Sequence, residues 1–134
     1  MPEKMSGTTP GSPTPTTPQK LGINITGFIK GELGIGEGVR ATLRGIETTN
    51  IPFVINNIIS TYHRNSDTSY QKFTQENPHP INLFQVNANE VQTILKKPSF
   101  KKSFANKYNI GFWAWEIPKF PQKWITAFTP FSEI

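Results

Sequence analysis

The sequence predicts an α/β protein with an incomplete, doubly wound parallel sheet. Strand signals alternate with helix signals from Leu21 onward, and a glycine-rich turn joins the first strand to the first helix. The unbroken apolar character of "YNIGFWAWE" (108–116) is a third observation, because it is expected when both faces of a strand are covered. In such a sheet the glycine turn lies at the carboxyl end of the first strand, where open α/β sheets bind ligands.

The first 20 residues differ in composition from the rest. "MPEKMSGTTPGSPTPTTPQK" is rich in Pro, Thr, Ser and Gly and has no large apolar side chain beyond two methionines. Such a segment cannot bury enough surface to offset its ordering entropy, so we expect residues 1–20 to form a disordered tail. Residues 21–134 are long enough for one domain with a core.

The first half of this domain is expected to form strand, helix and strand. "INITGFI" (23–29) is dominated by β-branched and aromatic residues, which is typical of a buried strand. Val39, Leu43 and Ile46 then recur at helical spacing. "IPFVINNI" (51–58) is expected to be the second strand.

The second half begins with a long polar stretch, residues 60–80, which holds both histidines and the only aspartate. A loop of this length in a compact domain is often functional. The segments after it are a strand at 81–87, a helix at 88–97 stopped by Pro98, a strand at 108–116 and a helix beginning at Pro121. Four strands make an incomplete sheet, and we expect the chain to be truncated.

Composition narrows the class of protein. There is no cysteine, no apolar run near the roughly 20 residues of a membrane span, and no apolar signal segment at the N-terminus, so a soluble cytoplasmic protein is expected. The net charge is +5 and the pI about 9.6. Five lysines carry much of this excess, at positions 96, 97, 101, 102 and 107. We interpret them as a solvated helix end and loop rather than a nucleic-acid site, with attraction to an anionic membrane surface as a secondary role.

The glycine turn "GFIKGELGIGEGVR" fits neither common phosphate motif. A Walker A loop requires lysine where Glu37 stands, and a dinucleotide fingerprint requires a third glycine where Val39 stands. What remains is a turn around Gly34 and Gly36 that presents backbone amides at a helix N-terminus. A tight turn with no ligand is the alternative.

Three segments together resemble the N-terminal half of bacterial family 4-type glycosyltransferases. They are "GFIKGELGIGEGVRATLRGIE", "NPHPINLFQVNANEV" and "YNIGFWAWEIPKFPQKWITAFTPFSEI", and the resemblance spans about residues 22–134. It implies a GT-B fold, in which two Rossmann-like domains face each other across a cleft. The implied activity is retaining transfer of a hexose from a nucleotide-sugar to a sugar, lipid-linked or polysaccharide acceptor, without a metal or other cofactor. Asp67 is the only aspartate, so a DxD metal motif is impossible.

The chain also departs from this family. The donor-binding half carries paired glutamates separated by seven residues, and no two glutamates here have that spacing. We therefore expect half of a cleft that does not turn over alone, located in the cytoplasm or at the inner face of the membrane. The alternatives are a non-catalytic remnant or interaction module and, more weakly, a generic nucleotide-binding domain.

The resemblance also implies site residues. Glu116 would be the catalytic carboxylate at the end of the fourth strand, although Trp115 stands where many relatives carry a histidine. The expected substrate-binding residues are Gly34, Gly36, Glu32, Glu37, His63, Asn87 and Asn89. The glycines, acids and asparagines have structural alternatives: tight turning for the glycines, solvent exposure or the helix dipole for the acids, and local capping for the asparagines.

Overall fold

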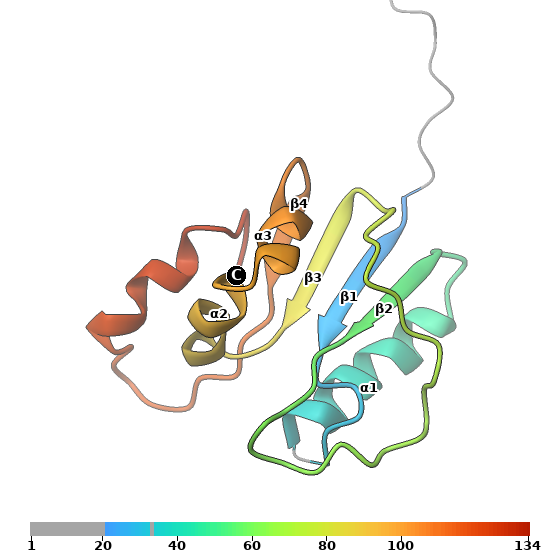
Figure 1. Ribbon diagram of the computed structural model, residues 1–134, viewed down its shortest axis with the longest axis horizontal. Coiled ribbons are helices and arrows are strands. Elements are labelled where there is room, and N and C mark those ends of the chain that lie inside the picture. The colour runs from blue at the N-terminus through green and yellow to red at the C-terminus, as the bar shows by residue number, and fades with distance from the viewer. Residues whose placement is uncertain (1–20, 33) are drawn as a thin grey trace, which may run out of the picture.

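The computed structural model describes residues 21–32 and 34–134, and its centre is a four-stranded sheet (Figure 1). The strands are β1 (Ile23–Gly27), β2 (Phe53–Asn57), β3 (Ile81–Gln85) and β4 (Tyr108–Gly111), in the spatial order β2-β1-β3-β4. All three strand pairs are parallel. The predicted parallel α/β sheet is therefore confirmed, whereas the tail expected at residues 1–20 lies outside the described residues.

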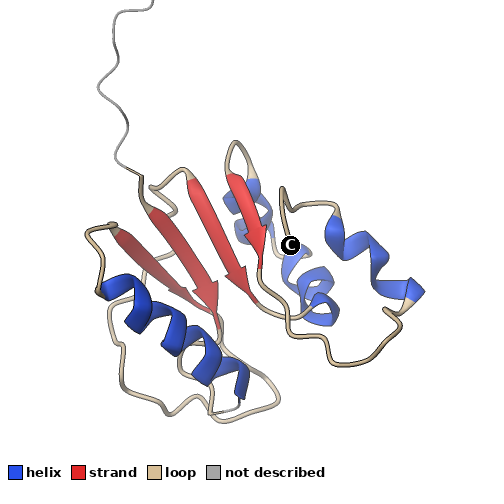
Figure 2. Ribbon diagram, turned by 180° about the vertical axis from the view of Figure 1, so that it is seen from behind, coloured by secondary structure: helices blue, strands red, loops and turns tan. Residues whose placement is uncertain are grey.

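Helices cover both faces of the sheet (Figure 2). Helix α1 (Gly34–Glu47) packs on one face, and α2 (Ala88–Leu95), α3 (Pro98–Phe104) and the 3-10 helix η1 (Gln122–Phe128) lie on the other. Two apolar cores result. The α1 side is built from Ile25, Ile29, Val39, Leu43 and Ile55, and the opposite side centres on Phe84, Val86, Val91, Ile94 and Ala127.

A row of three buried asparagines fixes the register of β1, β3 and β4. Asn24, Asn82 and Asn109 face one another on β1, β3 and β4 and are at most 5% exposed. Asn24 Nδ2 donates to Asn82 Oδ1 at 2.8 Å, and Asn82 Nδ2 donates to Asn109 Oδ1 at 2.8 Å. A slip of one residue would turn these amides toward the apolar α1 face and leave them unpaired, so the row selects a single register.

The crossover from β2 to β3, residues 58–80, contains no helix or strand. Its middle follows the free edge of β2, where the Thr74 backbone N–H donates to the Ile55 carbonyl at 2.8 Å. In a regular doubly wound sheet a helix occupies this connection and covers the face opposite α1. Among the described residues no helix covers the β2 end of that face, and α2 and α3 lie over β3 and β4 (Figure 1).

Several expected element boundaries in the second half were wrong. The helix expected at 88–97 ends at Leu95, and Pro98 begins a further helix, α3, in whose first turn its missing N–H costs nothing. The fourth strand ends at Gly111 rather than at residue 116. Trp113 and Trp115 therefore lie in a loop, where they contact the ring of Phe120 and join an aromatic cluster. Packing of these rings against the α2 side replaces the strand pairing that the apolar run suggested.

The asparagine row generates a stability prediction. Asn82→Ala leaves Asn109 Oδ1 without its donor in a buried layer, which costs about 1–3 kcal/mol, whereas Asn24 Nδ2 keeps its bond to the His79 carbonyl. We expect a corresponding fall in the urea midpoint at unchanged slope. The control is Asn50→Ala, an exposed turn position, which is expected to change the free energy of unfolding by less than about 0.5 kcal/mol. Equal effects of the two variants would contradict the proposed role of the row.

Candidate functional site

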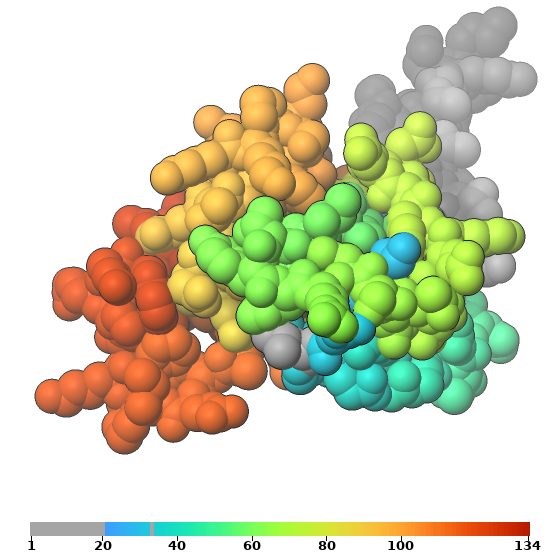
Figure 3. Space-filling view, turned by 60° about the horizontal axis from the view of Figure 1, so that its bottom comes forward, coloured from blue at the N-terminus to red at the C-terminus, as the bar shows by residue number. Residues whose placement is uncertain are grey.

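A cavity of about 310 Å³ opens at the carboxyl ends of β1, β2 and β3. Its walls come from the glycine turn, from the start of the crossover and from the N-terminus of α2, and include Gly34, Ser60, His63, Asn87, Asn89 and Glu90. In Figure 3 the segment that follows β2, in green, lies between α1 in cyan and the yellow and orange helices. Because β1 connects toward β2 on one side and borders β3 on the other, this is the switch point at which open α/β sheets bind ligands.

A second cavity of about 410 Å³ adjoins the first. The two share Phe28, Ser60, His63, Asn89 and Glu90 in their walls. The second extends along the outer side of α2 to Thr93 and Lys97. Together the two cavities form one trough at the carboxyl ends of the strands, with polar side chains along its length.

Glu90 is the carboxylate of this trough. It lies in the first turn of α2, and one carboxyl oxygen, Oε2, is buried without a hydrogen-bond partner among the described residues. Burial raises the pKa of Glu90, opposed in part by a hydrogen bond to the Asn87 backbone and by the charge of His63. Glu90 lines the cavity while Oε2 is buried, so a hydrogen bond from a ligand hydroxyl would be accepted by the other carboxylate oxygen, Oε1.

Sequence reasoning missed Glu90. A signal was present, since Asn87-x-x-Glu90 has the spacing of a capping box at a helix N-terminus. Asn87 is indeed the N-cap of α2, but its side chain makes no capping bond. Its Oδ1 instead accepts from the Ala114 backbone N–H at 3.0 Å, which ties the loop after β4 to the trough.

Local hydrogen bonds hold His63 at the trough. The hydroxyl of Ser60 accepts from the backbone N–H of Tyr62 at 3.2 Å and of His63 at 3.1 Å. Asn65 braces the same turn, because its Nδ2 donates to the Ser60 carbonyl at 2.9 Å. This is a serine turn of the kind that orders a loop without a helix. The structure therefore brings four of the expected site residues together: Gly34, His63, Asn87 and Asn89.

Gly36 has a packing role, the structural alternative to ligand binding at this turn. It is buried in α1, and a Cβ at this position would meet the carbonyl oxygen of Gly31 far inside van der Waals contact. The glycine is needed so that the turn can fold back onto the helix. Gly34, by contrast, is exposed with open space where its Cβ would be, and it borders the cavity.

A buried arginine accounts for Glu37. Arg40 is 4% exposed, and its Nη1 donates to the Ile29 carbonyl at 2.8 Å and to the Gly31 carbonyl at 2.7 Å. Its remaining nitrogens face Glu37 Oε2 at 3.2 Å and Asp67 Oδ2 at 3.5 Å. Glu37 also bonds Arg44, and hydrogen bonds from these two arginines lower the pKa of its carboxyl. Glu37 thus belongs to an ion-pair network on the outside of α1, away from the trough.

Glu32 and Glu116 also lie outside the cavities. Glu32 is exposed, and its carboxylate accepts a hydrogen bond from the Ser66 hydroxyl. Its backbone N–H donates to the Arg64 carbonyl at 3.1 Å, so that Glu32 contacts the crossover twice. Glu116 was expected to close the fourth strand, and this placement was wrong: the strand ends five positions earlier, and Glu116 is an exposed loop residue. Glu90 is the carboxylate that the fold brings to the switch point.

The lysine-rich segment is partly helical. Lys101 and Lys102 lie on α3, and Lys107 Nζ donates to the carbonyls of Asn77 and His79 at 2.8 and 2.7 Å. Lys97 borders the trough. Contact of the exposed lysines with a membrane surface stays a prediction. Within residues 21–32 and 34–134, no helix has the length and apolar character that crossing a membrane would take, and no three His, Asp or Glu side chains gather as a metal site.

Comparison of the chain with protein-family models, with curated proteins and with solved structures finds no match. The class of protein that fold and site define is therefore an α/β parallel-sheet protein with a polar trough at its switch point.

The two glycines of the turn are expected to behave in opposite ways. Gly36→Ala forces the added Cβ against the Gly31 carbonyl and is expected to lower the free energy of unfolding by about 1–3 kcal/mol. Gly34→Ala meets nothing within 4 Å and is expected to leave stability unchanged within about 0.5 kcal/mol. Urea denaturation of both variants measures the difference. A Gly36→Ala variant as stable as the parent would contradict the close contact between residue 36 and the Gly31 carbonyl.

Glu90 gives a pH-dependent prediction. Because its pKa is raised in the folded state, the folded chain binds the proton more tightly than the unfolded chain. Its contribution to stability is therefore complete below the unfolded pKa and is lost as pH rises through the folded pKa. Glu90→Gln removes this loss, so the variant is expected to gain stability relative to the parent on the alkaline side of that window.

Urea denaturation across a pH series measures this difference. Glu76→Gln, an exposed position on the crossover, is the matched control and is expected to follow the parent at every pH. If the Glu90→Gln and parent curves run parallel, the carboxylate is not desolvated as described.

Proposed function

We propose that this chain is the acceptor-binding half of a retaining, nucleotide-sugar-dependent glycosyltransferase of the GT-B type. The observation that carries the proposal is the trough at the switch point, in which Gly34, His63, Asn87 and Asn89 come together from three segments around Glu90. Two of the three sequence segments that resemble the family line this trough, the glycine turn and the strand-to-helix turn after β3, and the third contacts it through the hydrogen bond of Ala114 to Asn87.

The chemistry of the trough suits a sugar. Hydroxyl groups both donate and accept hydrogen bonds, and they are matched by carboxylate, imidazole, amide and hydroxyl side chains, here Glu90, His63, Asn89 and Ser60. Apolar contact comes from Phe28 and Ile35 at the base of the cavity. On this proposal Glu90 accepts the hydrogen bond of the reacting acceptor hydroxyl and orients it, the role first expected for Glu116.

The donor is assigned a different place. A nucleotide-sugar reacts by breaking the bond between its anomeric carbon and the diphosphate oxygen, and the acceptor oxygen forms the new bond to that carbon. The leaving diphosphate needs charge stabilisation, to which the exposed amides around Gly34 at the start of α1 would contribute. We propose that a second Rossmann-like domain supplies the remaining contacts, so that these 134 residues bind an acceptor without turning over the donor.

A second candidate is a saccharide-binding module without catalysis. It is favoured by the position of Glu116, which the family resemblance makes catalytic but which is exposed on a loop outside the trough. Both candidates use the same cavity. They differ in whether hexose transfer appears when the chain is joined to a donor-binding domain.

Saccharide binding tests the shared part of the proposal. Titration with cellobiose and maltose, followed by two-dimensional NMR of the side-chain amides, is expected to shift the Asn89 resonances. Glu90→Gln and His63→Ala are each expected to weaken binding about 10-fold or more, because each removes a charge-assisted or direct hydrogen bond in the cavity. Glu76→Gln is the control and is expected to bind as the parent does. Failure of both disaccharides to move Asn89 would contradict the proposed function.

A further inference from the structure

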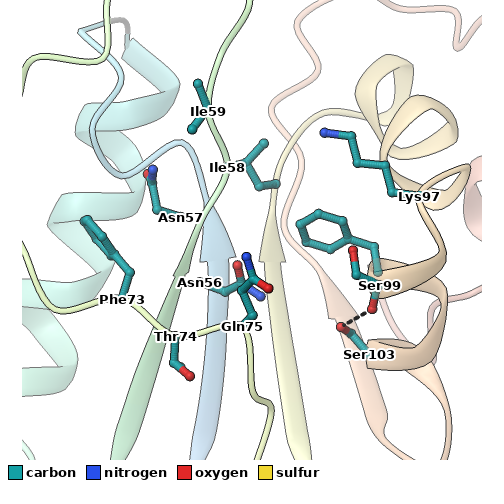
Figure 4. A pocket seen from close by; sticks show the side chains of 11 residues that line it. Asn56, Asn57, Ile58, Ile59, Phe73, Thr74, Gln75, Lys97, Ser99 and Ser103 are labelled. Carbon is teal, nitrogen blue, oxygen red and sulfur yellow. Dashed lines mark hydrogen bonds between the residues drawn. The ribbon is translucent and has the colours of Figure 1, made fainter.

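A third cavity, of about 480 Å³, lies over the sheet face that the crossover leaves without a helix. It is bounded on one side by the segment Phe73–Gln75 and on the other by the turn into α3 at Lys97 and Ser99 (Figure 4). Its floor is the end of β2. The volume is within the roughly 300–1,000 Å³ range of small-molecule sites.

The floor of this cavity carries the side-chain amide of Asn56, which is 6% exposed. This amide can both donate to and accept from a ligand hydroxyl. On the α3 side of the cavity the Ser103 hydroxyl donates to the backbone carbonyl of Ser99 at 3.0 Å (Figure 4). Thr26, beside Asn56 in register on β1, is buried and does not line the cavity.

The remaining lining selects the chemical class of such a ligand. Thr74, Gln75 and Ser99 supply uncharged donors and acceptors, and Phe73 and Phe100 supply aromatic surface. Lys97 is the one charged side chain in this lining. Amides and hydroxyls beside aromatic rings match a molecule with many hydroxyl groups and apolar C–H surface, which is a saccharide rather than an acyl chain or a polyphosphate.

This cavity is continuous with the trough at the switch point. It shares Ile58, Ile59 and Lys97 with the second cavity, which in turn shares His63 and Glu90 with the first. Three cavities therefore follow one another from the glycine turn, past Glu90, to Asn56. A chain of linked units fits such a row, whereas a single sugar fills only one part of it.

We propose that the third cavity is a distal subsite for an acceptor saccharide, so that the substrate is an oligosaccharide or polysaccharide whose reactive end lies at Glu90. The assignment rests on the proposed function for the identity of the reactive end. The distal subsite itself rests on Asn56, Gln75 and the open sheet face.

The test compares a disaccharide with a pentasaccharide of the same linkage, in the cello and malto series, on the full chain. Both lengths are expected to shift the Asn89 side-chain amide, and only the pentasaccharide is expected to shift Asn56 and Gln75. Additional hydrogen bonds in the distal subsite are expected to make the pentasaccharide bind about 10-fold more tightly.

Gln75→Ala is expected to remove most of this gain, because Gln75 lines the cavity and is exposed, so that its loss does not disturb the core. Gln71→Ala is the matched control: it has the same chemistry on the same crossover but lies outside the cavity, and it is expected to bind as the parent does.

The outcomes separate the two proposals. Equal affinity for both lengths with shifts at Asn89 alone overturns the distal subsite and leaves the proposed function standing. Shifts at Asn56 and Gln75 without Asn89 support a saccharide site in the third cavity and overturn the reactive end at Glu90. The absence of shifts at all three residues overturns both.

Discussion

The buried guanidinium of Arg40 is the interaction on which the site depends. Arg40 is a residue of α1, and its guanidinium joins three segments. It contacts the turn after β1 through the Ile29 and Gly31 carbonyls, its own helix through Glu37, and the crossover through Asp67. A buried cation is tolerated only when its donors are satisfied, so the turn must fold back onto α1 for the domain to form. That folding back requires Gly36, leaves Gly34 at the edge of the trough, and anchors the crossover whose first residues carry His63.

Because the crossover between β2 and β3 has no helix, it leaves room for the cavities that lie beside it. A helix between β2 and β3 would cover the face opposite α1 and fill the space over Asn56. An extended chain along the edge of β2 satisfies that edge through Thr74 but leaves the face open. The same chain begins with the serine turn at Ser60, which forms one wall of the trough. Both candidate subsites are thus consequences of one irregular connection.

Polar residues on the α2 side of the sheet have two separate uses. At the amino end of the strands, Asn24, Asn82 and Asn109 bond one another and fix the register. At the carboxyl end, Asn56 lies on the same face and lines the open cavity. The asparagine row stabilises the fold, whereas the Asn56 amide stands at a surface that a ligand can reach.

The sequence by itself determined the parallel α/β sheet, because strand and helix periodicity and a glycine turn are local patterns. It also singled out His63, on the long connection after β2, and Asn87 and Asn89, just after β3, which the structure places at one cavity. Only the tertiary structure decided the rest. Glu90 lines the cavity from the first turn of α2, and Gly36 is needed because Gly31 folds back on it. The end of the apolar run, residues 112–116, leaves the sheet, and its tryptophans pack on Phe120. These outcomes depend on contacts between segments distant in the chain, whose energies no local pattern records.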